Sequence, residues 1–327
     1  MKLKKIKSLL KDSQLDLAEL KKLTWGGIPS EHRSLIWKIL MGYAPTLIER
    51  RQETINRKRK EYFDYRKRIF IKHNEINEIN EMHLDVELWH QIQIDVPRTC
   101  PESELIQDKV IQKLLERLLY IWSTRHPASG YVQGINDLAT PFIMVFIADY
   151  FKNGKKIQPE SLTQVQLDEV ESDVFWCLSK LLDGIQDNFT SAQRGIQRQL
   201  ALLKYLLIKI DVKLANHLQN EQLHYVQFAF RWMNCLLMRE FQLNQIIRIW
   251  DTYLSETPIG FSQFHVYVCA ALLSHFSSQL LKLDFQELIM FLQNLPTKQW
   301  DTKEIEVLLS QAYLWCTIFN DAPNHLI

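Results

Sequence analysis

Residues 108–123 read DKVIQKLLERLLYIWS, and this run carries the strongest structural signal in the chain. Apolar side chains recur in it every three or four positions, at Val110, Ile111, Leu114, Leu115, Leu118, Leu119, Ile121 and Trp122. This spacing predicts a helix with one wide apolar face, which must pack against other parts of the protein. We expect the helix to end at His126-Pro127, because a proline disfavours helix in the residue before it.

Similar spacing recurs toward the C-terminus. The predicted helices cover residues 172–182, 197–210, 223–239, 244–254, 263–281 and 285–292. A last helix should begin after Asp301, because that carboxylate can accept free backbone amides while Glu304 bonds back to it. Only nine glycines and ten prolines interrupt the chain, and alternating strand patterns are hard to find. The sequence therefore predicts an all-α fold without significant β-sheet.

The composition is that of a packed globular protein whose net charge is too small to produce a strong electrostatic field. Of the 327 residues, 46% are hydrophobic and 24% charged, and 39 Lys and Arg nearly balance 38 Asp and Glu. This balance disfavours general attraction to nucleic acid or to an anionic membrane. The five cysteines form no C-x-x-C pair, so we expect reduced thiols. The apolar runs fall short of the ~20 residues that span a membrane, and we expect a cytosolic protein.

Common motifs of nucleotide and metal chemistry do not occur in the chain. It has neither the P-loop pattern nor G-x-G-x-x-G, and it lacks H-E-x-x-H and G-x-S-x-G. Its ten histidines are scattered without the spacing of metal ligands. We therefore expect no nucleotide, metal or other cofactor bound by the chain itself.

Residues 92–99, IQIDVPRT, form the first candidate functional segment, here called the arginine segment. Pro97 fixes its own φ and disfavours helix at Val96, so Arg98 should project from a stiff, non-helical stretch. A long charged side chain on such a base suits insertion into a partner. The plainer alternative is a local ion pair between Arg98 and Asp95.

Residues 129–137, SGYVQGIND, form the second candidate, here called the glutamine loop. Gly130 and Gly134 bracket Gln133 and permit a tight turn with close approach of another backbone. The Gln133 carboxamide offers two donors and an acceptor, which can orient a water molecule. The alternative is a structural turn, stapled by Asn136 and Asp137, before a helix that starts or kinks at Thr140-Pro141.

Together the two segments resemble the signature motifs of TBC-domain Rab GTPase activators, I-x-x-D-x-x-R and Y-x-Q-G. The similarity continues outside them, at Trp25–Pro29, Phe228–Glu240 and Ile249–Leu254. The similarity covers roughly residues 25–320. Within the family, the chain most resembles the subfamily of the yeast Golgi Rab activator and its animal relatives. The resemblance implies an all-α domain of stacked helices that acts on a Rab-family GTPase.

The resemblance also implies roles for particular residues. Arg98 would be an arginine finger that neutralises charge on the transferred phosphoryl group, and Gln133 a glutamine finger that positions the attacking water. GTP and magnesium would be bound by the partner GTPase. The residues implied to support the loops or contact the GTPase are Asp95, Tyr131, Gly134, Asn136, Asp137 and Arg231.

The same likeness suggests a domain layout and a location. Residues 1–24 would form a basic, amphipathic leader, residues 25–320 the TBC domain, and residues 321–327 a tail. Peripheral association with Golgi or endosomal membranes would then depend on partners. We expect surface loops at residues 74–85 and 153–166, which are polar.

Two other functions remain open from the sequence. The first is a TBC scaffold that binds a Rab or an adaptor without accelerating hydrolysis. The second is binding of nucleic acid or an acidic partner through the basic run at residues 50–72. For that run we favour a simpler structure, in which aromatic residues at near-helical spacing form a buried face and basic residues form a solvated one.

Overall fold

The computed structural model describes residues 2–70, 84–151 and 157–319. The chain forms two compact units, one of Met1–Leu23 with Ile28–Asp183 and the other of Thr24–Gly27 with Gly184–Ile327. Within the described residues the secondary structure is helical, and the extended pairing is limited to one isolated bridge between Gln14 and Leu47. The prediction of an all-α fold is confirmed.

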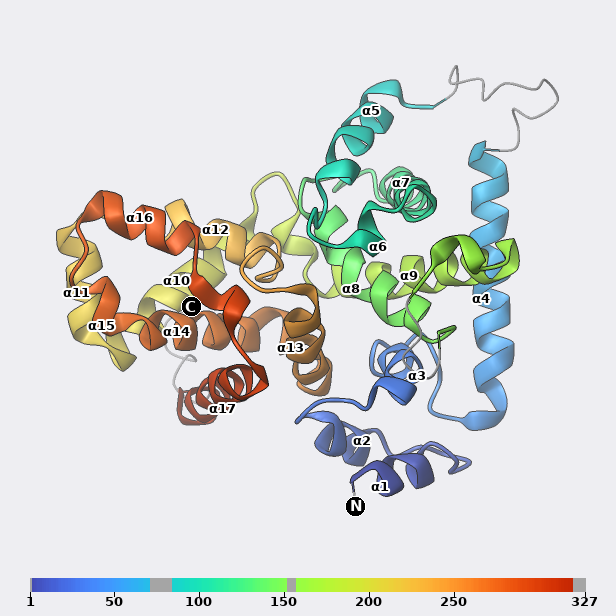
Figure 1. The fold of residues 1–327 in the computed structure, drawn as a ribbon, viewed down its shortest axis with the longest axis horizontal. Helices are drawn as coiled ribbons and strands as arrows, with labels where there is room; N and C mark the ends of the chain where they lie inside the picture. The colour runs from blue at the N-terminus through green and yellow to red at the C-terminus, as the bar shows by residue number, and fades with distance from the viewer. Residues whose placement is uncertain (1, 71–83, 152–156, 320–327) are drawn as a thin grey trace. The chain divides into compact units, whose positions relative to one another are not determined.

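The first unit is built around α7 (Figure 1). Its α-helices are α1 (Lys2–Leu9), α2 (Leu17–Thr24), α3 (Ser30–Leu40), α4 (Ile48–Phe70), α5 (Val86–Asp95), α6 (Glu104–Gln107), α7 (Lys109–Arg125), α8 (Ile135–Ala148) and α9 (Gln164–Gly184), with short 3₁₀ helices η2 (Val96–Arg98) and η3 (Pro159–Ser161). α7 contacts α4, α5, α6 and α8. This central helix thereby brings the segments before and after it together.

α7 forms as its sequence predicts. Asp108 caps it by accepting the backbone N–H of Val110 over 2.8 Å, and the helix ends at Arg125, with His126 as its C-cap. Of the predicted apolar face, all but the half-buried Val110 is buried. Burying a side chain of this size contributes about 1.5–3 kcal/mol, so this helix is a main source of the unit's stability.

α8 begins earlier than predicted and contains its proline. Of the predicted start or kink at Thr140-Pro141, the start is wrong, because α8 starts at Ile135, directly after Gly134 with φ of 110°. The kink stays a prediction. Pro141 has no N–H for the carbonyl of Asp137 one turn earlier. The hydroxyl of Thr140 donates to that carbonyl instead, over 2.9 Å. A local substitute for the missing bond thus lets the helix continue.

The basic run lies on α4, as far as the described residues reach, since residues 71 and 72 fall outside them. Tyr62 is fully buried, which confirms part of the predicted buried face. The prediction that the basic residues are simply solvated is wrong for at least three of them. Arg51 is 7% exposed and donates to the backbone carbonyls of Pro45, Thr46 and Leu10. Arg59 donates to both carboxylate oxygens of Asp173 on α9, and Arg66 does the same to Asp168. α4 is therefore held to α9 partly by charge.

The second unit is a separate set of helices (Figure 1). Its α-helices are α10 (Arg194–Ile210), α11 (Val212–Asn220), α12 (Val226–Asn234), α13 (Leu243–Ser255), α14 (His265–His275), α15 (Ser277–Leu280), α16 (Phe285–Gln293) and α17 (Thr302–Phe319). Short helices η4 (Gln186–Asn188), η5 (Gly260–Phe264) and η6 (Pro296–Gln299) connect them. α14 is almost entirely buried and packs against α10 and α17, so it forms the core of this unit.

Several predicted boundaries in this unit need correction. The helix expected over 223–239 stops at Asn234, because Leu236 and Leu237 adopt positive φ angles of 48° and 62°. The helix expected over 263–281 is broken at Phe276 into α14 and α15. The predicted start of α17 is confirmed, since Asp301 accepts the Glu304 amide over 3.1 Å and Glu304 accepts the Asp301 amide over 2.6 Å.

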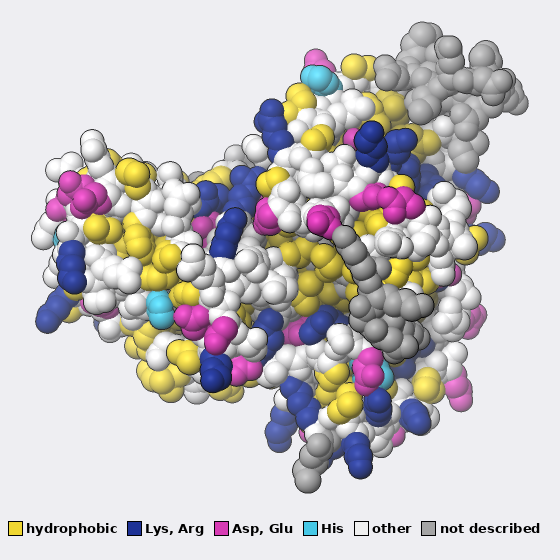
Figure 2. Space-filling model, in the orientation of Figure 1, with side chains coloured by type: hydrophobic (Ala, Val, Ile, Leu, Met, Phe, Trp, Pro, Cys, Tyr) yellow, Lys and Arg dark blue, Asp and Glu magenta, His cyan; other side chains and the backbone are white. Residues whose placement is uncertain are grey.

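The remaining predictions concern loops and surface. The loop predicted at 74–85 lies mostly outside the described residues, and so does the start of the one predicted at 153–166. That second prediction is wrong at its end, where α9 begins at Gln164. Of the five cysteines, all free, four are buried and Cys100 is partly exposed. In the described part of the chain, each helix is too short or too polar to cross a membrane. Figure 2 shows both signs of charge on the visible face.

Candidate functional site

The arginine segment continues directly from α5 into the single turn of η2. Val96 has helical angles and is fully buried, and Pro97 occupies the start of the turn, where its missing N–H costs no bond. The amide of Thr99 closes the turn on the carbonyl of Val96 over 3.1 Å. The prediction of a non-helical stretch is therefore wrong. Arg98 nevertheless projects, since it is exposed at the last position of this rigid turn.

Asp95 faces the interior and does not form an ion pair with Arg98. The residue is only 7% exposed, and its carboxylate accepts the hydroxyl of Tyr131 at Oδ2 over 3.1 Å. Among the described residues, Arg98 makes no hydrogen bond or ion pair. The alternative of a local pair between Arg98 and Asp95 is wrong. The exposed guanidinium is left accessible to a partner molecule.

The glutamine loop turns sharply on its two glycines. Gly130 and Gly134 have φ angles of 61° and 110°, which other residues rarely adopt. The amide of Ile135 donates to the carbonyl of Val132 over 3.1 Å and closes the turn around Gln133. The Gln133 side chain is exposed. The glycines thus play the conformational part that the sequence predicts for them.

Asn136 organises the loop through both ends of its amide. Its Oδ1 atom accepts the backbone amide of Gly134 over 2.9 Å and lies 3.2 Å from the Tyr131 hydroxyl. Its Nδ2 atom donates to Oγ1 of Thr99 over 2.8 Å. Asn136 is 2% exposed, so these bonds are shielded from water. The prediction that Asn136 holds this turn together is confirmed. Asn136 also bonds to Thr99 in the arginine segment.

The two candidate segments are therefore joined in space. Helix α7, ~26 Å long at 1.5 Å per residue, separates them along the chain. The bonds from Tyr131 to Asp95 and from Asn136 to Thr99 nevertheless connect them. Each segment carries one exposed polar side chain, Arg98 or Gln133, above a buried polar layer. This layer can hold a cation and a carboxamide on one connected surface.

Two further predicted residues have different surroundings. Asp137 is buried in the first turn of α8, where the helix dipole favours an anion. Arg231 lies in the second unit, where it donates to both carboxylate oxygens of Glu240, over 2.8 and 3.0 Å, and to the carbonyl of Gln293. These bonds join α12 to the residues after it and do not support the candidate loops. Contact of Arg231 with a partner stays a prediction.

Sequence reasoning missed the buried Thr99 and the half-buried Gln107, which bonds to it. Gln107, at the end of α6, donates from Nε2 to the carbonyl of Thr99 over 2.9 Å. Neither residue belongs to an apolar period or to a spaced polar motif. The available signal for Thr99 was its place next to Arg98, because a buried neighbour can anchor an exposed arginine.

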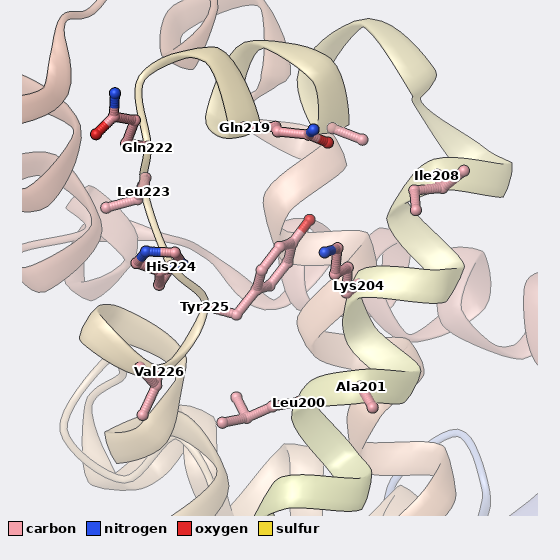
Figure 3. A pocket seen from close by; sticks show the side chains of 11 residues that line it. Leu200, Ala201, Lys204, Ile208, Gln219, Gln222, Leu223, His224, Tyr225 and Val226 are labelled. Atoms are coloured by element: carbon pink, nitrogen blue, oxygen red, sulfur yellow. The ribbon is translucent and has the colours of Figure 1, made fainter.

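A separate pocket of about 420 Å³ lies within the second unit (Figure 3). It opens between α10, α11 and the segment that leads into α12, and its walls are mainly apolar. Figure 3 shows the Tyr225 ring between these walls, with Lys204 and Gln219 near its hydroxyl. Burial raises the pKa of Tyr225 to about 12, so the hydroxyl stays neutral at physiological pH. The pocket contains no residue of the arginine segment or glutamine loop.

Comparison with known proteins defines the class of this chain. It belongs to the Rab-GTPase-TBC domain family, which matches residues 30–281. It is 49% identical to the GTPase-activating protein gyp1 of Schizosaccharomyces pombe, over 99% of this chain and 63% of that protein. It is 50% identical to TBC1 domain family member 22A of Mus musculus, over 99% of this chain and 62% of that protein. The resemblance inferred from the two motifs is confirmed.

The solved structure of the Ypt/Rab-GAP domain of Gyp1p has the same fold. It superposes with a TM-score of 0.90 at 47% sequence identity, over 97% of this chain and 98% of that chain. The chain spans about 63% of the length of the curated relative from S. pombe. The predicted domain limits at residues 25 and 320 stay a prediction.

Proposed function

We propose that this chain accelerates GTP hydrolysis on a Rab-family GTPase by supplying Arg98 and Gln133 to its active site. The observation that carries the proposal is the buried layer of hydrogen bonds joining the two segments beneath these exposed side chains. Membership of the Rab-GTPase-TBC family supports the choice of partner. GTP and magnesium would be bound by the GTPase.

The proposed chemistry needs positioning and charge more than covalent participation. In hydrolysis, water attacks the γ-phosphorus and GDP leaves, while negative charge spreads over the phosphoryl oxygens. The Arg98 guanidinium is planar and permanently charged, so it can bridge two of those oxygens. The Gln133 carboxamide can accept a hydrogen bond from the attacking water and donate to the phosphate. Both groups would enter the partner's site without being consumed.

The experiment is a hydrolysis assay on a panel of GTP-loaded Rab proteins with catalytic amounts of this chain. The chain should accelerate at least one Rab, and Arg98→Ala or Gln133→Ala should remove most of that acceleration. Arginine fingers are typically worth 10³- to 10⁵-fold. Arg57→Ala, at an exposed arginine on α4, is the matched control and should keep full activity. Full activity in both finger variants refutes the residue assignment.

The cellular role follows the same proposal. Inactivation of a Rab at Golgi or endosomal membranes would place the chain in vesicle traffic, with recruitment by partners. A scaffold that binds Rab without catalysis is the competing outcome. It would show as a stable complex with GTP-bound Rab and an unchanged hydrolysis rate across the panel.

A further inference from the structure

Thr99 has an unusual position for a residue next to an exposed arginine. It follows Arg98 directly, yet its side chain is 0% exposed. Its backbone is extended, with φ of −75° and ψ of 121°, so the chain leaves the η2 turn at this residue. Whatever holds Thr99 therefore also sets the base from which Arg98 projects.

Every polar group of Thr99 is used. Its amide donates to the carbonyl of Val96 over 3.1 Å, and its carbonyl accepts Nε2 of Gln107 over 2.9 Å. Its hydroxyl donates to the carbonyl of Asp95 over 3.0 Å and accepts Nδ2 of Asn136 over 2.8 Å. A hydroxyl can donate and accept at once, which no apolar side chain of the same shape can do.

Asn136 and Tyr131 both link the two segments, and the bond from Asn136 to Thr99, at 2.8 Å, is shorter than that from Tyr131 to Asp95, at 3.1 Å. The other link, from the Tyr131 hydroxyl, is shared, because its single proton faces Oδ2 of Asp95 at 3.1 Å and Oδ1 of Asn136 at 3.2 Å. The Asn136 amide instead directs one N–H to Thr99 over 2.8 Å. The other end of the same amide holds the Gly134 N–H, directly after Gln133. Thr99 is thus two hydrogen bonds from the backbone beside Gln133.

We propose that Thr99 is a positioning residue, whose hydroxyl couples the arginine segment to the glutamine loop so that Arg98 and Gln133 enter the GTPase as one pre-arranged pair. This proposal rests on the GTPase-activating function proposed above. Arranging both groups before binding avoids the entropy of ordering two independent loops in the complex. A displacement of about 1 Å at a reacting group can cost about 100-fold in rate.

The test compares Thr99→Val, which keeps the shape and removes the hydroxyl, with Thr99→Ser, which keeps the hydroxyl. Thr99→Val should lower kcat of Rab GTP hydrolysis by about 10- to 100-fold and change KM for GTP-bound Rab by less than about threefold. Thr99→Ser should restore kcat to within about threefold of the wild type. Retention of the full kcat by Thr99→Val overturns the proposal.

The matched control is Thr252→Val in the second unit. The Thr252 hydroxyl is also fully buried, donates to the carbonyl of Trp25 over 2.7 Å and accepts Nη1 of Arg248 over 2.8 Å. This variant should keep kcat. An equal loss in both variants indicates a general loss of stability and overturns the proposal.

Two further readouts separate positioning from simple damage to the fold. In an Arg98→Ala background, Thr99→Val should lower the remaining rate by less than about threefold, because the pairing of Arg98 with Gln133 that Thr99 maintains is already lost. Hydrogen exchange of the Gly134 amide should be faster in Thr99→Val than in Thr99→Ser, because Asn136 loses its bond to the Thr99 hydroxyl.

Equal exchange in the two variants contradicts the coupling of the two segments through Thr99, and this result does not depend on finding a Rab that responds. If the wild type accelerates hydrolysis and Thr99→Val is fully active, the positioning role of Thr99 is refuted while the proposed GTPase-activating function stands.

Discussion

The hydroxyl of Tyr131 lies 3.1 Å from Oδ2 of Asp95, although 36 positions separate the two residues in the sequence. This bond joins one residue of each signature motif, the tyrosine of Y-x-Q-G and the aspartate of I-x-x-D-x-x-R. It shows why a tyrosine and an aspartate accompany the glutamine and the arginine. They lie in the buried layer, while Gln133 and Arg98 reach the surface.

Tyr131→Phe should weaken both stability and catalysis. It removes the recorded donor to the buried Asp95 carboxylate, and an unsatisfied buried group costs about 1–3 kcal/mol. We expect kcat to fall about 10-fold through loosening of the loops. Chemical denaturation and the hydrolysis assay measure the two effects. Tyr65→Phe is the control, because Tyr65 donates to Glu61, whose side chain is 36% exposed and can bond to water instead, and both quantities should stay near the wild type.

Arg98→Lys should behave almost like Arg98→Ala. A lysine keeps the positive charge, but its ammonium cannot bridge two phosphate oxygens in one plane. We expect kcat to fall by at least about 100-fold, with the stability unchanged because Arg98 is exposed. Single-turnover hydrolysis with saturating chain measures this. A lysine variant with more than half the wild-type rate would show that charge alone suffices.

Glu171→Ala should destabilise the first unit strongly. Glu171 is 0% exposed and accepts the Tyr62 hydroxyl over 2.6 Å and Nε of Arg117 over 3.2 Å. Removing the carboxylate leaves buried donors without their anion, at a cost of about 3–5 kcal/mol. Urea denaturation measures the loss. Glu31→Ala breaks the exposed pair with Lys7 and should leave the unfolding midpoint unchanged.

Two buried groups of the second unit should respond to pH in opposite directions. Burial lowers the pKa of His265 to about 4, below its ordinary 6.5, and burial raises the pKa of Glu240 to about 7, above its ordinary 4.5. Between pH 4.5 and 6.5 the unfolded chain binds the proton at His265, so stability falls as the pH falls. The folded protein keeps the proton on Glu240, so this group raises stability as the pH falls.

Glu240→Gln should therefore expose the dependence on His265. The slope of unfolding free energy against pH should become steeper than in the wild type by about 1.4 kcal/mol per pH unit in that window. Denaturation at several pH values measures the slope. Glu306→Gln, at an exposed glutamate on α17, should give a profile parallel to the wild type. Parallel profiles for Glu240→Gln would show that its carboxyl titrates alike in both states.

Prediction from sequence succeeded where the signal is local. The apolar period of α7 predicts its buried face, and the capping pair Asp301 and Glu304 predicts the start of α17. Prediction failed where packing overrides local preference. Leu236 and Leu237 end α12 early in a conformation that leucine disfavours, and Val96 adopts helical angles before a proline. Each of these three residues is buried, so tertiary contacts hold the local backbone.

The sequence by itself determined that the chain is helical and that Arg98 and Gln133 lie in a family-specific pair of motifs. Helical periods, caps and short motifs are encoded within a few neighbouring residues, so they can be read without knowing the fold. Only the tertiary structure decided that Thr99 meets Asn136 and that Arg59 and Arg66 face carboxylates of α9. Those contacts join residues far apart in the chain, and they exist because buried polar groups must find partners once packing has brought them together.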